Sequence, residues 1–321
     1  MSDSGSGGPP PRTVVVLGGA GFLGRRVCRA FGALPGHRVL AVTRRPAAPV
    51  AGARTVVLDA LTGPVGALHE VVADADVVVN AAGDTWEGTE DQMTASHIPL
   101  LERLLRALDA APARPRLVQI GSVHEYGRVP PGTVVREEHP TVPATQYGRT
   151  KLAGTRMVLE ATAAGAADGC VLRISNMCGP GSPRRSFLGG LALRLRKSAA
   201  SGTRLSLPVV DERRDFVDVD DVASAVVAAA GAPVSGRLIN IGQGAATGMR
   251  ELAWLLVTVS GLPAHLVDEE TVPASGDGSW IRLDTTLAGT LLGWSPRTSL
   301  KDSLRGLWEA SLQEDNWPVR L

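Results

Sequence analysis

The sequence predicts an α/β protein built on a doubly wound parallel sheet, and two observations carry this prediction. Short runs rich in valine, leucine and isoleucine alternate with longer helical patterns from residue 12 to residue 175. Strands that are apolar on both faces are typical of a parallel sheet covered by helices on both sides. A glycine cluster between the first strand and the first helix is typical of the same fold class.

The expected elements follow one another in a regular order. A strand over residues 14–16 leads into the glycine cluster, and a helix through Phe22, Val27 and Phe31 follows. Further strands are expected over residues 37–45, 54–60, 75–83, 116–122 and 169–175. Long helices are expected over about 91–111 and 146–164. The segments 205–231 and 236–244 are expected to return to the same sheet.

Composition excludes several classes of protein. The chain has 321 residues with a formal net charge of +1, which predicts no binding to nucleic acid or to an anionic membrane. No apolar run approaches the roughly 20 residues that a membrane-spanning helix needs. The three cysteines, Cys28, Cys170 and Cys178, are widely separated and lack the spacing of metal ligands. We therefore expect a soluble, cytoplasmic protein with no metal site.

The glycine cluster has the spacing GxxGxxG and opens the first strand-to-helix unit. Glycine permits a tight turn and a close approach of the backbone, so that the N-terminus of the helix faces a pyrophosphate. A dinucleotide site on a Rossmann-type sheet is the prediction, and a purely structural turn is the alternative. The residues expected to contact the cofactor here are Gly18, Gly21, Phe22, Leu23 and Gly24.

The end of the second strand indicates which dinucleotide binds. It reads "AVTRR", with Arg44 and Arg45 where an acidic residue would hold the ribose of NAD. Arginine holds a 2′-phosphate by charge-assisted hydrogen bonds, which favours NADP(H). Two surface arginines are the alternative. Asp59 and Ala60 end the third strand and are expected at the adenine edge, although Asp59 can equally cap the next helix.

The stretch "YGRTK" places Tyr147 and Lys151 four residues apart, on one face of the expected helix. The lysine ammonium is expected to lower the pKa of the phenol, and a shift of roughly 3 units requires about 4 kcal/mol. Ser122 ends the fifth strand, at the sheet edge where ligands bind in such folds. The three residues together predict proton transfer to a substrate oxygen, against the alternative of a solvated helix face.

In its ordered motifs the chain resembles an extended short-chain dehydrogenase/reductase, of the type grouped as NAD-dependent epimerase/dehydratases. The resemblance covers residues 13–307 and rests on "GGAGFLG", "VVNAAG", "GSVHEYG", "YGRTK", "LRISNMCGPG", "RRDFVDVDDVASAV" and "LGWSPRTSLKDSL". It implies that Tyr147 is the general acid/base, that Lys151 binds the nicotinamide ribose and that Ser122 orients the carbonyl.

The same resemblance implies the remaining site residues. Ala81, Ala82 and Gly83 follow the fourth strand and are expected to contact the cofactor. Residues expected on the substrate side are Asp84, Thr85, Trp86, Ser122, Val123, His124, Asn176, Arg214 and Arg282. Asn176 and Arg214 fall where relatives hold a nucleotide-sugar diphosphate, and Arg282 is a second basic clamp. The alternatives are a surface loop for residues 84–86, a turn role for Asn176 and an ion pair of Arg214 with Asp211 or Asp215.

Domain boundaries follow from these assignments. The dinucleotide-binding Rossmann domain is expected over residues 12–174 and 209–242. A smaller, discontinuous α/β substrate-binding domain is expected over 175–208 and 243–321, and residues 1–11 are expected to form a flexible tail. By resemblance, the two long helices are expected to pair across a twofold axis in a homodimer.

Departures from the family narrow the expected chemistry. Val123 and His124 stand where 4,6-dehydratases carry an acidic pair. We therefore do not expect this chain to catalyse a 4,6-elimination. We expect NADPH-dependent reduction of a keto group, at C4, on a dTDP- or UDP-linked deoxysugar, such as a dTDP-4-keto-6-deoxyhexose in antibiotic biosynthesis. The alternatives are a nucleotide-sugar 4-epimerase with tightly bound NAD, a reductase of a free lipid-like ketone, and a non-catalytic dinucleotide-sensing protein.

Overall fold

The structure is a computed structural model that describes residues 10–83, 90–209, 211–271 and 280–313. Its centre is a seven-stranded sheet in the order β11-β6-β5-β4-β1-β2-β3, in which every neighbouring pair is parallel. The strands are β1 (Arg12–Leu17), β2 (His37–Thr43), β3 (Arg54–Val57), β4 (Val77–Asn80), β5 (Arg116–Ser122), β6 (Asp168–Ile174) and β11 (Leu238–Ile241). The predicted doubly wound parallel sheet is confirmed.

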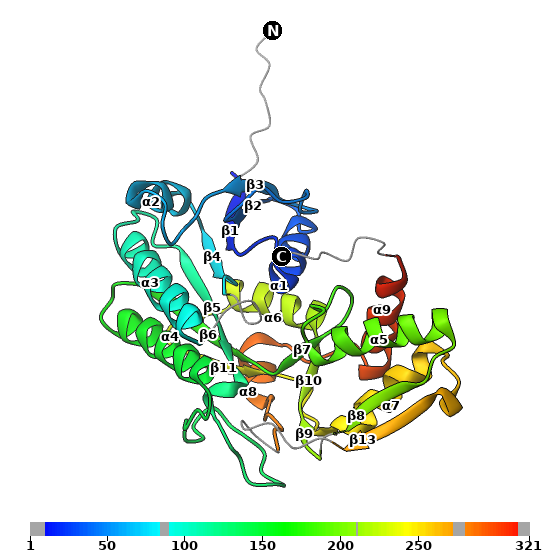
Figure 1. The fold of residues 1–321 in the computed structure, drawn as a ribbon. Coiled ribbons are helices and arrows are strands. Elements are labelled where there is room, and N and C mark those ends of the chain that lie inside the picture. Colours follow the sequence, from blue (N-terminus) through cyan, green and yellow to red (C-terminus); the bar gives the residue numbers. More distant parts are fainter. Residues whose placement is uncertain (1–9, 84–89, 210, 272–279, 314–321) are drawn as a thin grey trace.

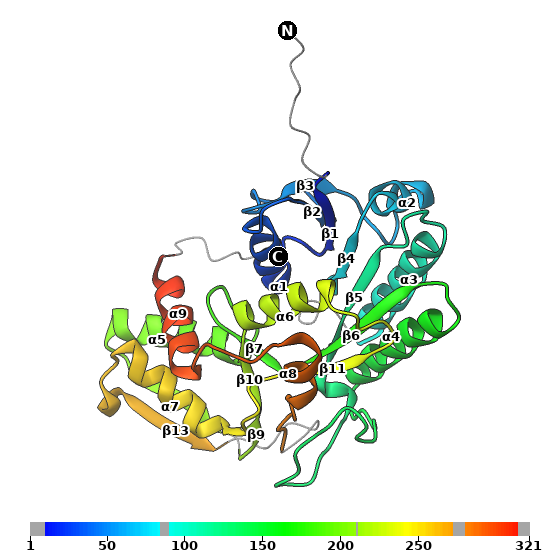
Figure 2. The same cartoon turned by 180° about the vertical axis from the view of Figure 1, so that it is seen from behind.

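Helices cover both faces of this sheet. On one face lie α2 (Val65–Ala73), α3 (Glu90–Asp109) and α4 (Gln146–Ala163), and on the other α1 (Phe22–Gly32) and α6 (Val219–Gly231) (Figures 1 and 2). The period of two in β1 separates the two cores. Val14 and Val16 pack in the cluster under α1 and α6, whereas Val15 and Leu17 pack in the cluster under α2, α3 and α4.

A second group of elements lies beside the main sheet (Figure 1). Helices α5 (Phe187–Ser201), α7 (Met249–Ser260) and α9 (Leu300–Gln313) contact one another and share a separate hydrophobic cluster. Strand β8 (Leu205–Val209) pairs in parallel with β13 (Val267–Thr271) at the edge of this group. The remaining described elements are β7 (Asn176–Cys178), β9 (Arg213–Arg214), β10 (Phe216–Asp218), β12 (Thr247–Gly248), α8 (Thr286–Leu292), η1 (Val123–Glu125) and η2 (Ala264–Leu266).

One topological expectation is wrong in part. The segment 236–244 returns to the central sheet as strand β11. The segment 205–231 contributes only helix α6, which joins the layer that covers the sheet. Strand β8 instead pairs with β13, because Leu205 and Leu207 are buried against the helices of the second group. Strand β10 pairs with β7 in a two-stranded sheet of its own. The proposed domain boundaries stay a prediction, and most of the expected tail, residues 1–9, lies outside the described residues.

Candidate active site

The glycine turn between β1 and α1 is built by backbone packing. Gly18 has a φ of +73°, and a Cβ added there would lie 2.8 Å from the carbonyl oxygen of Ala81. A Cβ on Gly24 would lie 2.1 Å from the carbonyl oxygen of Gly18. The turn therefore requires glycine at both positions and lies against the segment that follows β4. Gly21 is the N-cap of α1 without a side-chain cap, which fits the binding of an anionic pyrophosphate by the first amides of the helix.

Further residues predicted to bind the cofactor lie at the same edge of the sheet. Strand β2 ends at Thr43, and Arg44 and Arg45 follow it as exposed side chains. Asp59 comes two residues after the end of β3, and its carboxylate accepts hydrogen bonds from the backbone N–H groups of Leu61 and Thr62, at 2.9 and 3.0 Å. It thus caps a local turn and not helix α2, which begins at Val65.

The structure brings Ser122, Tyr147 and Lys151 together. Ser122 is the last residue of β5, and Tyr147 lies in the first turn of α4, whose N-cap Thr145 accepts a hydrogen bond from Gly148 N. The Ser122 hydroxyl lies near enough to the Tyr147 phenol to lower its pKa. The Lys151 ammonium donates to the carbonyl oxygen of Ile120 at 3.3 Å and lies 5.8 Å from the centre of the Tyr147 ring.

The electrostatics of this group differ from the expectation. Desolvation raises the pKa of Tyr147 to about 12, outweighing the lowering effect of Ser122, and the charge of Glu125 raises it further. Desolvation lowers the pKa of Lys151 to about 8, against the opposing effect of Glu125. The expectation of a lowered pKa for the phenol is therefore wrong for the protein by itself, because desolvation is the largest effect. At neutral pH Tyr147 carries its proton and Lys151 is largely charged.

Behind Lys151 lies a small cavity of about 20 Å³, which has room for about one water molecule. Asn80 at the end of β4 donates to the side-chain oxygen of Gln119 at 2.8 Å, and both residues line this cavity. His97 of α3 also lines it and lies against Gly83, where an added Cβ would be 2.7 Å from the imidazole. Asn80 and Gln119 were not predicted from the sequence, because only the strand order brings them beside Lys151.

A buried ion pair that was not predicted from the sequence lies next to the backbone of Ser122. Glu125 is 0% exposed and forms a buried ion pair with Arg173 of β6, at 2.7 Å. The sequence holds one signal for this pair: a glycine, Gly121, precedes Ser122, and a Cβ on it would lie 2.8 Å from the carboxylate of Glu125.

Several residues that were expected on the substrate side are buried or are bonded to other parts of the protein. Val123 is buried in η1, and the ring of the half-buried His124 meets Tyr147 edge-on, with 5.6 Å between ring centres. Asn176 donates to the carbonyl oxygen of Asp215 at 2.9 Å. Arg214 forms an ion pair with Glu212, at 2.5 Å. Asp84, Thr85 and Trp86 lie outside the described residues.

Asp215 links the three residues proposed for the diphosphate. Its buried carboxylate accepts hydrogen bonds from the hydroxyl of Ser175 and from the backbone N–H groups of residues 243, 244 and 283. Arg282 in turn donates to the carbonyl oxygen of Gly244 at 3.0 Å. One buried acid thus ties together the loops that carry Asn176, Arg214 and Arg282.

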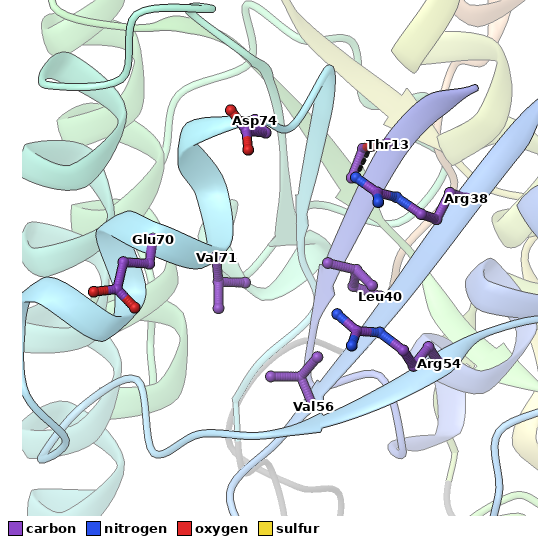
Figure 3. A pocket seen from close by; sticks show the side chains of 8 residues that line it. All are labelled: Thr13, Arg38, Leu40, Arg54, Val56, Glu70, Val71 and Asp74. Atoms are coloured by element: carbon purple, nitrogen blue, oxygen red, sulfur yellow. Dashed lines mark hydrogen bonds between the residues drawn. The ribbon is translucent and has the colours of Figure 1, made fainter. Parts of the chain in front are cut away.

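A larger cavity, of about 230 Å³, lies at the opposite edge of the sheet (Figure 3). It is lined by side chains of β1, β2 and β3, which include Arg38 and Arg54, and by side chains of α2 and its C-cap, which include Glu70 and Asp74. Ligands of such folds bind at the carboxyl ends of the strands, so this cavity is not the candidate active site. In the described ranges, no helix is long and apolar enough to cross a membrane, and no cluster of three potential ligands can hold a metal.

The strand order and the group formed by Ser122, Tyr147 and Lys151 define the extended short-chain dehydrogenase/reductase class. The sequence model of the NAD dependent epimerase/dehydratase family matches residues 14–242, and the chain belongs to that family.

Relatives within this family act on nucleotide-linked sugars. The chain is 39% identical over 305 residues to a dTDP-6-deoxy-L-talose 4-dehydrogenase (NAD(P)(+)) from Kitasatospora kifunensis, covering 94% of this chain and 96% of the relative. It is 28% identical to a GDP-6-deoxy-D-mannose reductase from Pseudomonas aeruginosa, covering 75% and 82%. The solved structure of MoeE5 with UDP-glucuronic acid and NAD matches with a TM-score of 0.80 and 26% identity, covering 94% and 99%.

Proposed function

We propose that the protein is an NADP(H)-dependent ketoreductase that reduces the C4 ketone of a dTDP-linked 6-deoxyhexose. The observation that carries this proposal is the 39% identity, along nearly the whole of both chains, to an enzyme named as a 4-dehydrogenase of a dTDP-6-deoxy sugar. A 4-dehydrogenase and a 4-ketoreductase run the same reaction in opposite directions. The arrangement of Ser122, Tyr147 and Lys151 supports the proposal, because it provides a proton donor beside a strand end.

In the proposed reaction Tyr147 gives its proton to the carbonyl oxygen of the sugar. Its raised pKa keeps the proton in place until negative charge develops on that oxygen. The hydroxyl of Ser122 orients the same oxygen, and the ammonium of Lys151 stabilises the tyrosinate that results and holds the nicotinamide ribose. A bound nicotinamide supplies the hydride. Val123 and His124 stand where 4,6-dehydratases carry an acidic pair, and the nearby carboxylate of Glu125 is buried in its ion pair with Arg173.

The proposed cofactor contacts are the turn over residues 18–24, Asp59, Ala60 and the segment 81–83. Arg44 and Arg45 are proposed to hold the 2′-phosphate of NADP(H), since both are exposed at the end of β2 and no acid replaces them. On the sugar-nucleotide side, Asn176, Arg214 and Arg282 are proposed to hold the diphosphate. Asp215 ties their loops together, which supports this assignment.

The test is a reaction with a dTDP-4-keto-6-deoxyhexose and NADPH carrying deuterium at both positions of C4 of the nicotinamide. We expect NADPH oxidation and deuterium on C4 of the sugar in the product, observed by NMR. The same ketone on UDP and a free lipid-like ketone are the matched controls, and we expect slower turnover with both.

Two outcomes would contradict the proposal. A product without deuterium would exclude hydride transfer to the sugar. A C4-epimerised sugar nucleotide formed without net use of NADPH, by protein that retains NAD through purification, would instead establish the 4-epimerase alternative.

A further inference from the structure

The buried ion pair between Glu125 and Arg173 is the strongest feature next to the proposed site that the proposed mechanism does not use. Glu125 is 0% exposed and Arg173 is 2% exposed. One oxygen of the carboxylate accepts two hydrogen bonds from the guanidinium, at 3.0 and 2.7 Å. The guanidinium carbon also lies 4.3 Å from the centre of the Tyr126 ring. Burying two charges is costly, so a pair in this position calls for a functional explanation.

The other oxygen of the Glu125 carboxylate lies at the end of β5, the strand that carries Ser122. It accepts a hydrogen bond from the backbone N–H of Ser122 at 2.7 Å, while the hydroxyl of Ser122 accepts one from the N–H of His124 at 3.3 Å. This reciprocal arrangement is a capping box, and it fixes the chain where it leaves the sheet. Gly121 leaves space for the carboxylate, since an added Cβ would lie 2.8 Å from its oxygen.

Helix α4 brings the proton-transfer residues to the same place. It packs on η1 so closely that a Cβ on Gly148 would lie 2.4 Å from the carbonyl oxygen of His124. Glu125 is therefore near both Tyr147 and Lys151, and its charge acts on both of them. The other titratable or charged groups around Lys151 are Arg173 of β6, His124 of η1 and His97 of α3.

We infer that Glu125 is a positioning residue that fixes the backbone of Ser122 and places its carboxylate charge near Lys151. Arg173 holds this carboxylate in its orientation inside the protein through two hydrogen bonds. The inference rests on the proposed function, because it assigns Ser122 and Lys151 to the reaction. The carboxylate does not touch the substrate in this arrangement, and it acts only through these neighbours.

The charge can be tested without any assay of activity. The chain has three lysines, Lys151, Lys197 and Lys301, so protein labelled with ¹³C at lysine Cε gives three NMR signals, which Lys151→Arg assigns. In the unaltered protein we expect the Lys151 signal to titrate near pH 8. In Glu125→Gln the midpoint is expected to fall by about half a unit or more, as the loss of a full charge a few ångströms away produces even in a water-like dielectric. Glu125→Asp keeps the charge and should keep the midpoint near that of the unaltered protein.

Two further variants separate this role from a structural one. Glu125→Gln leaves Arg173 buried without its partner and can fail to fold, whereas Glu125→Gln/Arg173→Met removes both charges and tolerates burial better. We expect a midpoint below that of the unaltered protein in this double variant as well, because Glu125 is the charge that acts on Lys151. The control is Asp168→Asn, which breaks the ion pair of Arg116 and Asp168 between β5 and β6 at the opposite edge of the sheet. We expect no change of the Lys151 midpoint there.

Steady-state kinetics complete the test. Glu125→Gln and the double variant Glu125→Gln/Arg173→Met are both expected to lower kcat about tenfold and to change KM less than about twofold. The reason is that the orientation of Ser122 matters in the transition state. The inference would be overturned if the midpoint of the Lys151 titration were unchanged in Glu125→Gln and in the double variant. An equal loss of kcat in Asp168→Asn would also overturn it. Failure of the proposed function would give a different result, because the unaltered protein would then not oxidise NADPH with the keto sugar. The titration of Lys151 would still test whether the charge of Glu125 acts on that lysine.

Discussion

At the level of single residues, the site depends on which groups lose contact with water. Tyr147 and Lys151 lie in one turn of α4, and desolvation moves their pKa values in opposite directions, to about 12 and about 8. Each shift favours the neutral form of its group. A neutral tyrosine suits proton donation to a ketone, which agrees with the reductive direction that we propose.

The first prediction concerns the proton donor. Tyr147→Phe removes only the phenolic hydroxyl and should lower kcat by roughly 10²–10⁴-fold with little change in KM, as expected for general acid catalysis. NADPH oxidation at saturating keto sugar measures the effect. Tyr126→Phe is the matched control, because this only other tyrosine is buried, its hydroxyl donates to Asn240, and phenylalanine keeps the ring that lies against Arg173. That variant should lose stability and keep most of its turnover. Near-full activity of Tyr147→Phe would remove the tyrosine from the mechanism.

The second prediction is a pH dependence. The pKa of Lys151 lies near 8, so its ammonium is present below that pH and is lost above it. We expect kcat to fall as pH rises through about 8. In Lys151→Arg the side chain stays charged across this range, so a lower kcat without this alkaline decline is expected. An identical decline in the arginine variant would assign it to another group.

At the level of secondary-structure elements, the turn that joins β1 to α1 packs closely through backbone atoms. The absence of side chains at Gly18 and Gly24 lets the helix start directly beside the segment after β4. This close packing places the first amides of α1 at the carboxyl edge of the sheet, where the glycine spacing predicted a pyrophosphate site.

Gly24→Ala tests this arrangement. Its Cβ would lie 2.1 Å from the carbonyl oxygen of Gly18, so the turn must move. We expect NADPH, titrated by its fluorescence, to bind at least about tenfold more weakly, and unfolding by urea to require about 1–3 kcal/mol less free energy. Gly66→Ala in α2 is the control, since nothing lies within 4 Å of its added Cβ, and it should leave NADPH binding unchanged. Unaltered affinity in Gly24→Ala would argue against a dinucleotide site at this turn.

The end of β2 carries the prediction on coenzyme choice. We expect at least about tenfold higher kcat/KM with NADPH than with NADH, equivalent to about 1.4 kcal/mol. Arg44→Ser/Arg45→Ser should erode this preference, because it removes the charges proposed for the 2′-phosphate. Arg38→Ser/Arg54→Ser is the matched control at the opposite ends of β2 and β3 (Figure 3) and should leave the preference intact. Equal use of both coenzymes by the unaltered protein would contradict the assignment.

At the level of the whole molecule, α3 and α4 lie side by side on one face of the sheet (Figure 1). We predict that these two helices pair with those of a second copy in a homodimer. Alanine and glycine are frequent in α4, and small side chains permit close contact between helices. Light scattering at micromolar concentration should report twice the 33.4 kDa of one chain. A particle with the mass of a single chain at that concentration would contradict the prediction.

The sequence by itself determined the parallel sheet and its first six strands along the chain, because runs that are apolar on both faces and a glycine turn are local patterns. The spacing of four also predicted that Tyr147 and Lys151 share one face of a helix, whereas the meeting of this pair with Ser122 was expected from the order of the motifs and the resemblance to the family. Only the tertiary structure decided the partner of β8, because an alternating run of five residues can pair with any edge strand that buries its leucines. Likewise, the pKa of Tyr147 and the pairing of Glu125 with Arg173, 48 positions apart in the chain, depend on burial, and burial is decided by what packs on top of a residue and not by its neighbours in sequence.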